Sequence, residues 1–547
     1  MRGSHSAVIA RLDRATQYAA AYQVDRWLPG VLDPRFRGDD AWRAVAKMNP
    51  NESRVALNTG LLILALVGSR LIAAAFTPIT FDEAYYWMWS KHLAGGYYDH
   101  PPMVAVVIRL GTLIAGDTEF GVRLFSILLA LPMSWAIYQA AAILFGSRRV
   151  AASAAVLLNV TLMAAVGTMI VTPDAPLLVA SSLLLFALAK VSQTDRGVWW
   201  LAVGAAAGCA LLSKYTALFF GPAILIWLVA VPRLRHWLVS PWLYLGGLVA
   251  LALFAPVILW NAGHHWVSFI KQMGRARIED FHPVFIAELI PTQIAFATPL
   301  VWVLGAMGLY ALIRRRAGTP PARVLVNTMF WVIVAYFVSH SLHARVEANW
   351  FGPIYPAFAI AAAVAAHLVE WPPRWQRLVD FCRRWAVPSG VVMFVLLVVQ
   401  ASTGVLSGYR RDATVRSVGV GWRETADKIE AVRARIGATC VLAPDYGTTA
   451  WLAFYLPKGT CVVQHGQRIR WVNMPEPDTV QLSGKLLYVY EARLGDAPYL
   501  KDRFARVERA GEAQRKRGPL LIETYALDLL ESPKVEVLDR SPPLELQ

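Results

Sequence analysis

Two adjacent carboxylates, Asp82 and Glu83, are the residues of this sequence best suited to chemistry. They come directly after an apolar run that ends near Phe76. Ionised side chains are costly in hydrocarbon, so acids at this position are expected to face water or a protein cavity. There a carboxylate could act as a general base that takes a proton from an attacking hydroxyl. The structural alternative is a helix cap formed by Thr80 and Asp82, and the two roles are compatible.

Three more ionisable residues lie near the ends of apolar runs. His100 precedes two prolines and could donate to a phosphate or orient Asp82, or it could be an ordinary interfacial histidine. Asp174 heads a helix, where the helix dipole would stabilise its charge even without a role in a site. Lys214 is the only charge between two apolar runs. It either extends toward the interface or binds a lipid phosphate, and we predict the second.

A further set of candidates alternates with other residues in one short loop. Arg345, Glu347 and Asn349 are spaced by two, which indicates an extended segment that presents one face. Arg345 would suit bidentate binding of a phosphate, and the alternative is a solvated charged loop. Tyr85, which follows the acid pair, belongs either to an interfacial aromatic belt or to a platform for a sugar.

The composition indicates a membrane protein that crosses the bilayer many times. Of 547 residues, 56% are hydrophobic and only 16% are charged, whereas soluble domains carry about 25% charged residues. Many apolar runs approach the roughly 20 residues that span a bilayer. The net charge of +16 fits the Lys and Arg of cytoplasmic loops better than nucleic-acid binding.

The positions of the basic residues predict the topology. The run from Pro101 to Gly116 carries Arg109 in its middle, so we interpret it as an interfacial or re-entrant helix. Eleven spans then remain, and with an inside N-terminus every dense basic cluster lies inside. The candidate residues named above all fall outside. The predicted spans are 54–76, 121–145, 150–170, 174–191, 198–212, 216–231, 241–260, 291–313, 324–341, 350–369 and 386–406.

We expect three parts along the chain. Residues 1–47 are polar and are predicted to be a disordered extension or the result of an early start codon, and 48–408 form the membrane domain. Residues 409–547 are predicted to form a small external α/β domain, in which Cys440 and Cys461 could be bridged because that compartment is oxidising. Helices are expected at 422–436 and 446–455, and strands at 439–443, 460–463, 485–490 and 519–524.

Five motifs together resemble a known family of membrane enzymes. They are Phe81-Asp82-Glu83-Ala84-Tyr85-Tyr86-Trp87, Tyr98-Asp99-His100-Pro101-Pro102, Thr172-Pro173-Asp174-Ala175-Pro176, Ser213-Lys214-Tyr215-Thr216 and Arg345-Val346-Glu347-Ala348-Asn349-Trp350. In this order they resemble the bacterial GT-C glycosyltransferases of the protein-mannosyltransferase-like superfamily, which includes lipid A aminoarabinose transferases and rhizobial galacturonosyltransferases. The resemblance covers about residues 54–470.

The resemblance implies a multispanning GT-C fold and a sugar donor carried on polyprenyl phosphate. It implies Asp82 as the periplasmic catalytic base with Glu83 in support, Asp174 as a second acid, and Lys214 and Arg345 as phosphate binders. His100 departs from the aminoarabinose transferases, which favours a hexose or a uronic acid as the sugar. The expected acceptor is lipid A or lipopolysaccharide core at the inner membrane. No further cofactor is implied, and dependence on a divalent metal stays open.

Three other functions are compatible with parts of this sequence. A protein O-mannosyltransferase-like enzyme would share the motifs but modify a protein hydroxyl. A polytopic transporter should show inverted repeats and broken helices near the bilayer midplane, and the sequence shows no internal repeat. A sensor or assembly protein built around 409–547 is the third alternative. The sequence decides neither the sugar nor the acceptor.

Overall fold

The computed structural model describes residues 50–275, 281–405, 413–495 and 498–541, so the predicted extension 1–47 lies outside the described residues. By internal contacts the chain divides into Met1–Leu57 and Asn58–Gln547. All contacts reported below lie within the second of these units.

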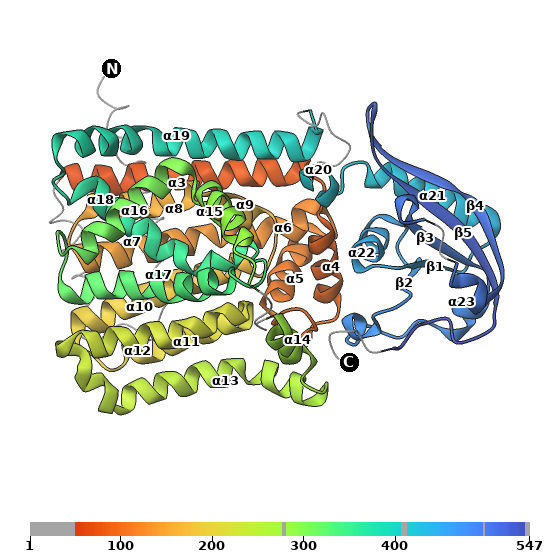
Figure 1. Cartoon of the computed structure of the whole chain (residues 1–547), viewed down its shortest axis with the longest axis horizontal. Coiled ribbons are helices and arrows are strands. Elements are labelled where there is room, and N and C mark those ends of the chain that lie inside the picture. Colours follow the sequence, from red (N-terminus) through yellow and green to blue (C-terminus); the bar gives the residue numbers. More distant parts are fainter. Residues whose placement is uncertain (1–49, 276–280, 406–412, 496–497, 542–547) are drawn as a thin grey trace, which may run out of the picture. The chain divides into compact units, whose positions relative to one another are not determined.

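The described chain is mainly helical up to Thr403, and most of its long helices run nearly parallel or antiparallel to one another (Figure 1). Seven helical segments are long and apolar enough to cross a membrane. They are α3 (Pro50–Phe76), α6 with α7 (Glu119–Leu128, Ala130–Phe145), α10 (Asp174–Thr194), α13 (Pro241–Gly263), α17 (Pro320–His340), η3 with α18 (Ala348–Ile354, Tyr355–His367) and α19 (Pro373–Thr403).

Two more candidate spans are broken, which raises the count to nine if each pair is one span. Helices α8 (Arg148–Val160) and α9 (Leu162–Met169) meet at 58°, and α15 (Val284–Ala297) and α16 (Pro299–Ile313) meet at 101°. The second break falls at Thr298, whose φ of 62° lies outside the helical region. Pro299 follows it and has no N–H to continue the helix.

The predicted count of eleven spans is therefore met only in the coarser form of seven to nine. Every predicted run is helical, but α11 (Trp199–Ser213) and the pair η1–α12 (Tyr215–Phe219, Phe220–Ala230) are short. At 1.5 Å per residue, the 15 residues of α11 rise only about 22 Å, against a hydrocarbon thickness of about 30 Å. The finer count stays a prediction.

Four shorter elements lie beside the long helices. The run 101–116 forms the helix α5 (Met103–Ala115), which packs against α4 (Phe81–Lys91) and α6, and its interfacial or re-entrant position stays a prediction. The contact with α6 is close, because a Cβ on Gly111 would lie 2.2 Å from the carbonyl oxygen of Gly121. The others are η2 (Pro232–Val239) and α14 (Val267–Arg275).

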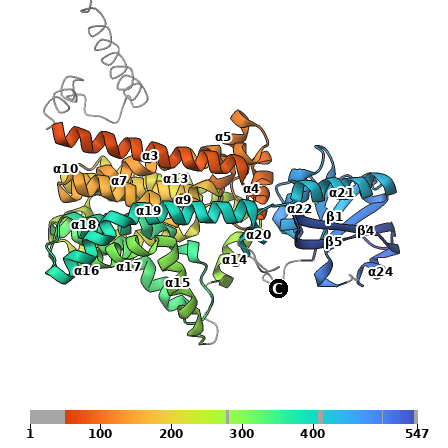
Figure 2. The ribbon, with the colours of Figure 1, turned by 90° about the horizontal axis from the view of Figure 1, so that it is seen from above.

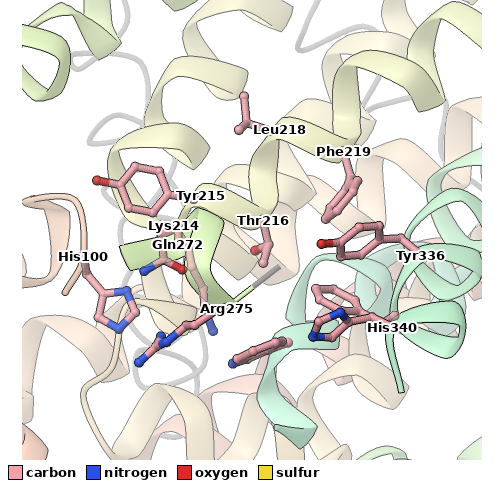
Figure 3. A pocket seen from close by; sticks show the side chains of 12 residues that line it. His100, Lys214, Tyr215, Thr216, Leu218, Phe219, Gln272, Arg275, Tyr336 and His340 are labelled. Atoms are coloured by element: carbon pink, nitrogen blue, oxygen red, sulfur yellow. The ribbon is translucent and has the colours of Figure 1, made fainter. Parts of the chain in front are cut away.

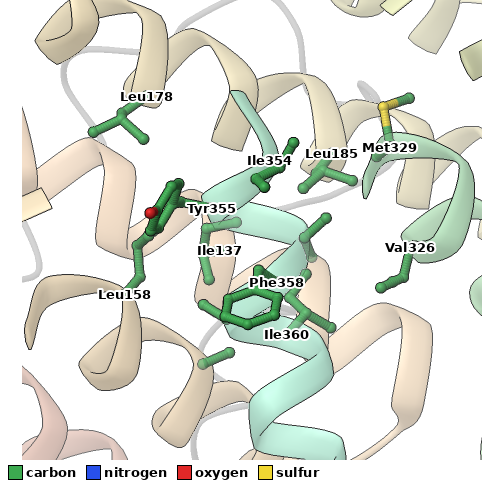
Figure 4. Packing of buried hydrophobic residues seen from close by; sticks show 14 of the residues in the cluster. Ile137, Leu158, Leu178, Leu185, Val326, Met329, Ile354, Tyr355, Phe358 and Ile360 are labelled. Carbon is green, nitrogen blue, oxygen red and sulfur yellow. The ribbon is translucent and has the colours of Figure 1, made fainter. Parts of the chain in front are cut away.

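The core of the helical part is built from small and branched apolar side chains. Helix α18 carries alanine at every second position from Ala357 to Ala365, and all five are buried. Small residues let helices approach closely, and a Cβ on Gly308 of α16 would lie 1.8 Å from the carbonyl oxygen of Ala361. Larger side chains such as Phe358 and Ile360 fill the space between the helices (Figure 4).

The C-terminal residues form one mixed five-stranded sheet in the order β2-β1-β3-β5-β4. Strands β1 to β3 are parallel, and β5 is antiparallel to both β3 and β4. Helix α21 (Trp422–Ile436) packs against β4, and α22 (Tyr446–Tyr455) packs against β1 and β2 (Figure 2). The strands are β1 (Cys440–Ala443), β2 (Cys461–Gln464), β3 (Leu486–Glu491), β4 (Phe504–Arg517) and β5 (Leu520–Pro533), with short helices α20 (Ala413–Ser417), η4 (Arg468–Trp471), α23 (Thr479–Ser483), η5 (Ala492–Leu494) and α24 (Leu500–Arg503).

The predicted helices and strands of this part are confirmed, although β5 extends to Pro533, beyond the predicted end at 524. Strand β4 and the short helices were not predicted. Half of the residues of β4 are charged, as is common in a strand at the edge of a sheet. Cys440 and Cys461 are register partners on β1 and β2 and form a disulfide, with their Cα atoms 4.6 Å apart. The predicted boundary between 408 and 409 stays a prediction.

Candidate active site

The second residue of the acid pair, Glu83, closes the N-terminus of α4. Its Oε2 accepts from the backbone N of Thr80 at 2.9 Å, and the Thr80 hydroxyl accepts from the backbone N of Glu83 at 3.1 Å. This reciprocal arrangement is a capping box. The predicted cap therefore exists, but Glu83 rather than Asp82 is the acid that makes it.

Glu83 is also half of a fully buried ion pair. Arg123 of α6 donates from Nε to Oε1 at 2.7 Å and from Nη2 to Oε2 at 2.6 Å, and neither side chain is exposed to solvent. The backbone N of Val171 donates to the same Oε1 at 3.0 Å. Arg123 in turn donates to the carbonyl oxygens of Thr77 and Pro78. Both oxygens of Glu83 are thus occupied by structural contacts.

Asp82 is in a different environment, although it is the neighbouring residue. It is half-buried, and its Oδ1 accepts a hydrogen bond from the hydroxyl of Tyr446 at 3.1 Å. Burial raises the pKa of Asp82 to about 6, against the opposing effect of the Tyr446 hydrogen bond. A base whose pKa lies near the working pH is the most effective proton acceptor. Asp82 therefore has the properties that its predicted role requires.

A second carboxylate, Asp99, lies at the centre of a buried network. Lys271 of α14 and Arg470 of η4 each approach one of its oxygens at 2.6 Å, and the Tyr85 hydroxyl donates to Oδ2 at 3.0 Å. Burial alone would raise the pKa of Asp99, but Arg470 and Lys271 outweigh it and hold the pKa well below its usual range. Asp99 is therefore ionised, and its charge is balanced by Lys271 and Arg470. The Tyr85 hydroxyl adds a hydrogen bond to this network.

Three of the predicted site residues, Asp174, Lys214 and Asn349, form a third cluster. Lys214 Nζ donates to Oδ1 of Asp174 at 2.7 Å, and Asn349 Nδ2 donates to Oδ2 at 2.7 Å. Asp174 is 1% exposed and Lys214 is 6% exposed. The cluster joins the start of α10, the junction of α11 with η1, and η3. Residues more than a hundred positions apart thus meet, as the topology predicted.

A pocket of about 340 Å³ opens beside these clusters. His100 and Arg275 lie on one side of it, and Tyr336 and His340 lie on the other (Figure 3). Nitrogen-bearing side chains and aromatic rings line the same cavity, which suits an anionic group joined to an apolar one. The lining residues are His100, Lys214, Tyr215, Thr216, Leu218, Phe219, Gln272, Arg275, Tyr336, Phe337, His340 and Trp350.

His100 lines this pocket and also lies against helix α4. Burial lowers the pKa of His100 to about 3, with a further contribution from Lys214, so the ring is neutral. Its buried Nδ1 has no hydrogen-bond partner among the described residues. The ring of Tyr86, one turn after Asp82 on α4, lies 6.1 Å from the His100 ring between centroids. Helix α4, which carries Asp82, therefore contacts a residue that lines the pocket.

Two of the predicted substrate-binding residues, Arg345 and Glu347, lie away from the pocket. Arg345 is exposed, and its Nε lies 3.3 Å from Oε2 of Glu288. Glu347 is also exposed, and neither residue lines the pocket. Only Asn349 of this loop reaches a site cluster. The phosphate role of Arg345 stays a prediction that these contacts do not support.

Several residues of the site were not predicted. Lys271, Gln272 and Arg275 all come from α14, and Tyr446 and Arg470 come from the C-terminal part. Lys271 and Arg275 are four residues apart, which places them on one face of a helix, so this spacing was a signal in the sequence. Nothing in the local sequence around Tyr446 or Arg470 distinguishes them from surface residues.

The described residues do not fit a site for a divalent metal. They contain no group of three or more His, Cys, Asp or Glu side chains placed to hold an ion. Asp99 and Asp174 are already paired with cations, and divalent metals of this kind prefer several free carboxylates. No step of the chemistry below depends on a metal.

Comparison with known proteins agrees with the predicted family. Residues 99–260 match the family described as dolichyl-phosphate-mannose-protein mannosyltransferase. A lipid A galacturonosyltransferase from Rhizobium johnstonii is 25% identical over 327 residues, which cover 57% of this chain and 66% of that protein. The alignment thus spans just under two thirds of that relative.

Solved structures share the fold. The structure of ArnT from Cupriavidus metallidurans bound to undecaprenyl phosphate has a TM-score of 0.60 and 19% identity, and the match covers 86% of this chain and 97% of that one. The apo state of the same protein matches equally well, with a TM-score of 0.60. The chain is a polytopic membrane protein that shares the fold of ArnT and is similar over residues 99–260 to the family of dolichyl-phosphate-mannose-protein mannosyltransferases.

Proposed function

We propose that this protein transfers a sugar from a polyprenyl-phosphate donor to a hydroxyl group, with Asp82 as the general base. The observation that carries the proposal is the environment of Asp82, a half-buried carboxylate whose raised pKa suits proton transfer. It lies on the helix that also contacts the rim of the pocket through Tyr86 and His100. The membrane helices would bring a lipid-linked donor to the same place.

The pocket suits the phosphate and the first part of the prenyl chain. Lys214 and Arg275 would bind the phosphate oxygens, and neutral His100 could donate one hydrogen bond to them. Phe219, Tyr336 and Phe337 would contact the isoprene units. The ArnT structure that shares this fold holds undecaprenyl phosphate, which supports a donor of this class.

The proposed reaction is a single displacement at the anomeric carbon of the sugar. The acceptor oxygen forms a bond to that carbon while the bond to the phosphate oxygen breaks, and Asp82 takes the proton of the acceptor hydroxyl. The electron pair of the broken bond leaves with polyprenyl phosphate, whose charge Lys214 and Arg275 would stabilise. Attack opposite the leaving group inverts the configuration of the sugar.

We propose lipid A or lipopolysaccharide core as the acceptor, which agrees with the name of the galacturonosyltransferase relative. With His100 before the proline pair, the donor sugar would be a hexose or a uronic acid. A protein hydroxyl is the second candidate, since the matched family is described by a protein mannosyltransferase. With either acceptor, the site and the C-terminal sheet would face the periplasm, and the chain would cross the inner membrane eleven times.

A transfer assay in membranes tests the proposal. With a radiolabelled polyprenyl-phosphate sugar, Asp82→Asn should lower the rate at least about 100-fold, because the base is lost. Asp117→Asn is the matched control, an acid whose partner is Lys91, and should transfer like the wild type. Full transfer by Asp82→Asn would exclude Asp82 as the base.

Two further measurements test the donor site and the topology. Arg275→Ala should raise the KM for the donor about tenfold while the rate at saturation changes less, because one cationic contact to the phosphate is lost. An unchanged KM would exclude Arg275 from the donor site.

Leu93→Cys places a thiol at an exposed position, and an impermeant reagent should label it from the periplasm. Labelling from the cytoplasm alone would contradict the topology.

A further inference from the structure

We propose that the C-terminal sheet domain supplies two positioning residues of the active site: Tyr446, which donates a hydrogen bond to the Asp82 carboxylate, and Arg470, which lies against the Tyr446 ring and balances the charge of Asp99. This inference rests on the proposed function, since it concerns the same base. It assigns a role in catalysis to residues that neither motif nor family match covers, because they lie more than 180 positions after residue 260.

Tyr446 is held rigidly where it meets Asp82. It is the first residue of α22, whose N-terminus is capped by Asp445 through a 2.8 Å hydrogen bond from the backbone N of Thr448. Its ring packs against Phe81 and Tyr85, with centroids 5.9 Å and 4.9 Å away. This packing fixes the position of the hydroxyl oxygen, and the hydroxyl donates to Asp82 at 3.1 Å.

Arg470 fixes the other side of the same arrangement. Its Nη1 lies 2.6 Å from Oδ2 of Asp99, and its side chain is only 12% exposed. The guanidinium also lies 4.8 Å from the Tyr446 ring centroid and 5.3 Å from that of Tyr98, within the range of cation–π attraction. Arg470 thus contacts both Tyr446, which donates to Asp82, and the carboxylate of Asp99.

The charges around Asp82 explain why these contacts matter. Glu83 and Tyr86 face it from its own helix, Asp99 from the following loop, and Tyr446 and Arg470 from the C-terminal part. Glu83 is neutralised by Arg123. Asp99 is neutralised by Lys271 together with Arg470, so loss of Arg470 would expose Asp82 to a stronger negative field.

The attachment of the C-terminal part does not depend on these two residues. Trp451 Nε1 donates to the carbonyl oxygen of Ile79 at 3.1 Å, and the backbone N of Gly419 donates to the same oxygen at 2.7 Å. Thr80 and Val418 form an isolated antiparallel bridge. Substitution of Tyr446 or Arg470 should therefore leave the C-terminal part in place, and the test can separate positioning from docking.

The first experiment compares two tyrosines of one helix. Tyr446→Phe removes the hydroxyl that donates to Asp82, so the acid limb of the kcat–pH profile should move up by about one pH unit. The KM for the donor should stay the same. Tyr455→Phe, at the other end of α22 with its hydroxyl near Glu119, is the control and should keep the wild-type profile. Identical profiles for the two variants would overturn the role of Tyr446.

The second experiment varies the charge at position 470. Arg470→Gln should move the acid limb in the same direction, and Arg470→Lys should restore part of the shift because it keeps the charge. Arg506→Gln, a change at an exposed arginine of β4, is the control. A uniform loss of activity at every pH, without rescue by lysine, would mean that Arg470 only stabilises the fold.

A third measurement does not require turnover. The carboxyl stretching band of Asp82, identified by its absence in Asp82→Asn, can be titrated by infrared difference spectroscopy. Its midpoint should rise in Tyr446→Phe and Arg470→Gln but not in the two controls. If the midpoint shifts but neither the wild type nor any variant transfers sugar, the proposed function is wrong and the positioning role stands. If the midpoint does not move, the positioning role is wrong.

Discussion

Asp82 and Glu83 are neighbours in the chain, yet they belong to two regions with opposite properties. Glu83 lies in a buried region where Arg123, Thr80 and Val171 occupy both of its oxygens. Asp82 lies at the edge of the site with one hydrogen bond from Tyr446, and within the described part of the chain no cation is in ion-pair contact with it. Consecutive residues of a helix point about 100° apart, so one faces the bundle and the other faces the site.

The difference teaches how to separate a structural acid from a working one. An acid whose oxygens all have fixed donors gains stability from them but has no oxygen left for a proton. An acid with few partners keeps a raised pKa and an accessible oxygen. Asp99 and Asp174 follow Glu83 in this respect, since both are paired with buried cations. Of these four acids, Asp82 is the one without an ion-pair partner among the described residues, which favours its proposed role as a base.

The largest expected effect concerns the structural region. Arg123→Ala leaves the Glu83 carboxylate buried without its cation, which should lower the free energy of unfolding by about 3–5 kcal/mol. Thermal unfolding in detergent, followed by tryptophan fluorescence, measures this change. Asp82→Asn is the comparison and should alter stability by less than about 1 kcal/mol. Equal destabilisation by the two variants would break the distinction between the neighbours.

The disulfide of the C-terminal sheet tests whether the properties of Asp82 depend only on its immediate neighbours. The disulfide between Cys440 and Cys461 closes 21 residues, and its replacement by two serines should cost about 2–4 kcal/mol of stability. The acid limb of activity should not move, because neither cysteine contacts Asp82. Cys209→Ser, at a free thiol, is the control for the substitution itself. A shifted pH profile would mean that the whole C-terminal part tunes the base.

The pH dependence of transfer sharpens the description of Asp82. Because burial raises its pKa to about 6, the base is ionised above that pH and protonated below it. The rate should therefore fall about tenfold for each pH unit below the pKa, equivalent to about 1.4 kcal/mol per unit. A rate–pH series at saturating donor measures this limb. A limb near pH 4 would show that Asp82 behaves as an ordinary exposed acid.

The smallest effect is expected for Arg345, which the sequence predicted to bind the phosphate of the donor. Arg345 pairs with Glu288 at the surface, and exposed pairs contribute about 0–1 kcal/mol. Arg345→Ala should therefore change the KM for the donor by less than about threefold, well below the effect of Arg275→Ala. Equal effects would restore Arg345 to the donor site and would mean that the loop moves when the donor binds.

Local sequence predicted the elements well where a pattern is periodic. The apolar runs became helices, and short apolar segments near Cys440 and Leu486 became strands of the sheet. Strand β4 was missed because half of its residues are charged, and the break at Thr298 was missed because a proline such as Pro299 is tolerated within membrane helices. Periodicity identifies what an element buries, and it carries no information about an edge strand or a bend.

The sequence by itself determined the class of protein, the family that it resembles and the acids worth testing, because composition and short motifs are local properties. Only the tertiary structure decided which of the two adjacent acids is saturated and which is available. It also brought Tyr446 and Arg470, more than 360 positions away, against Asp82 and Asp99. The cause is physical: burial and pairing depend on which side chains meet in space, and these set the charge and reactivity of a carboxylate.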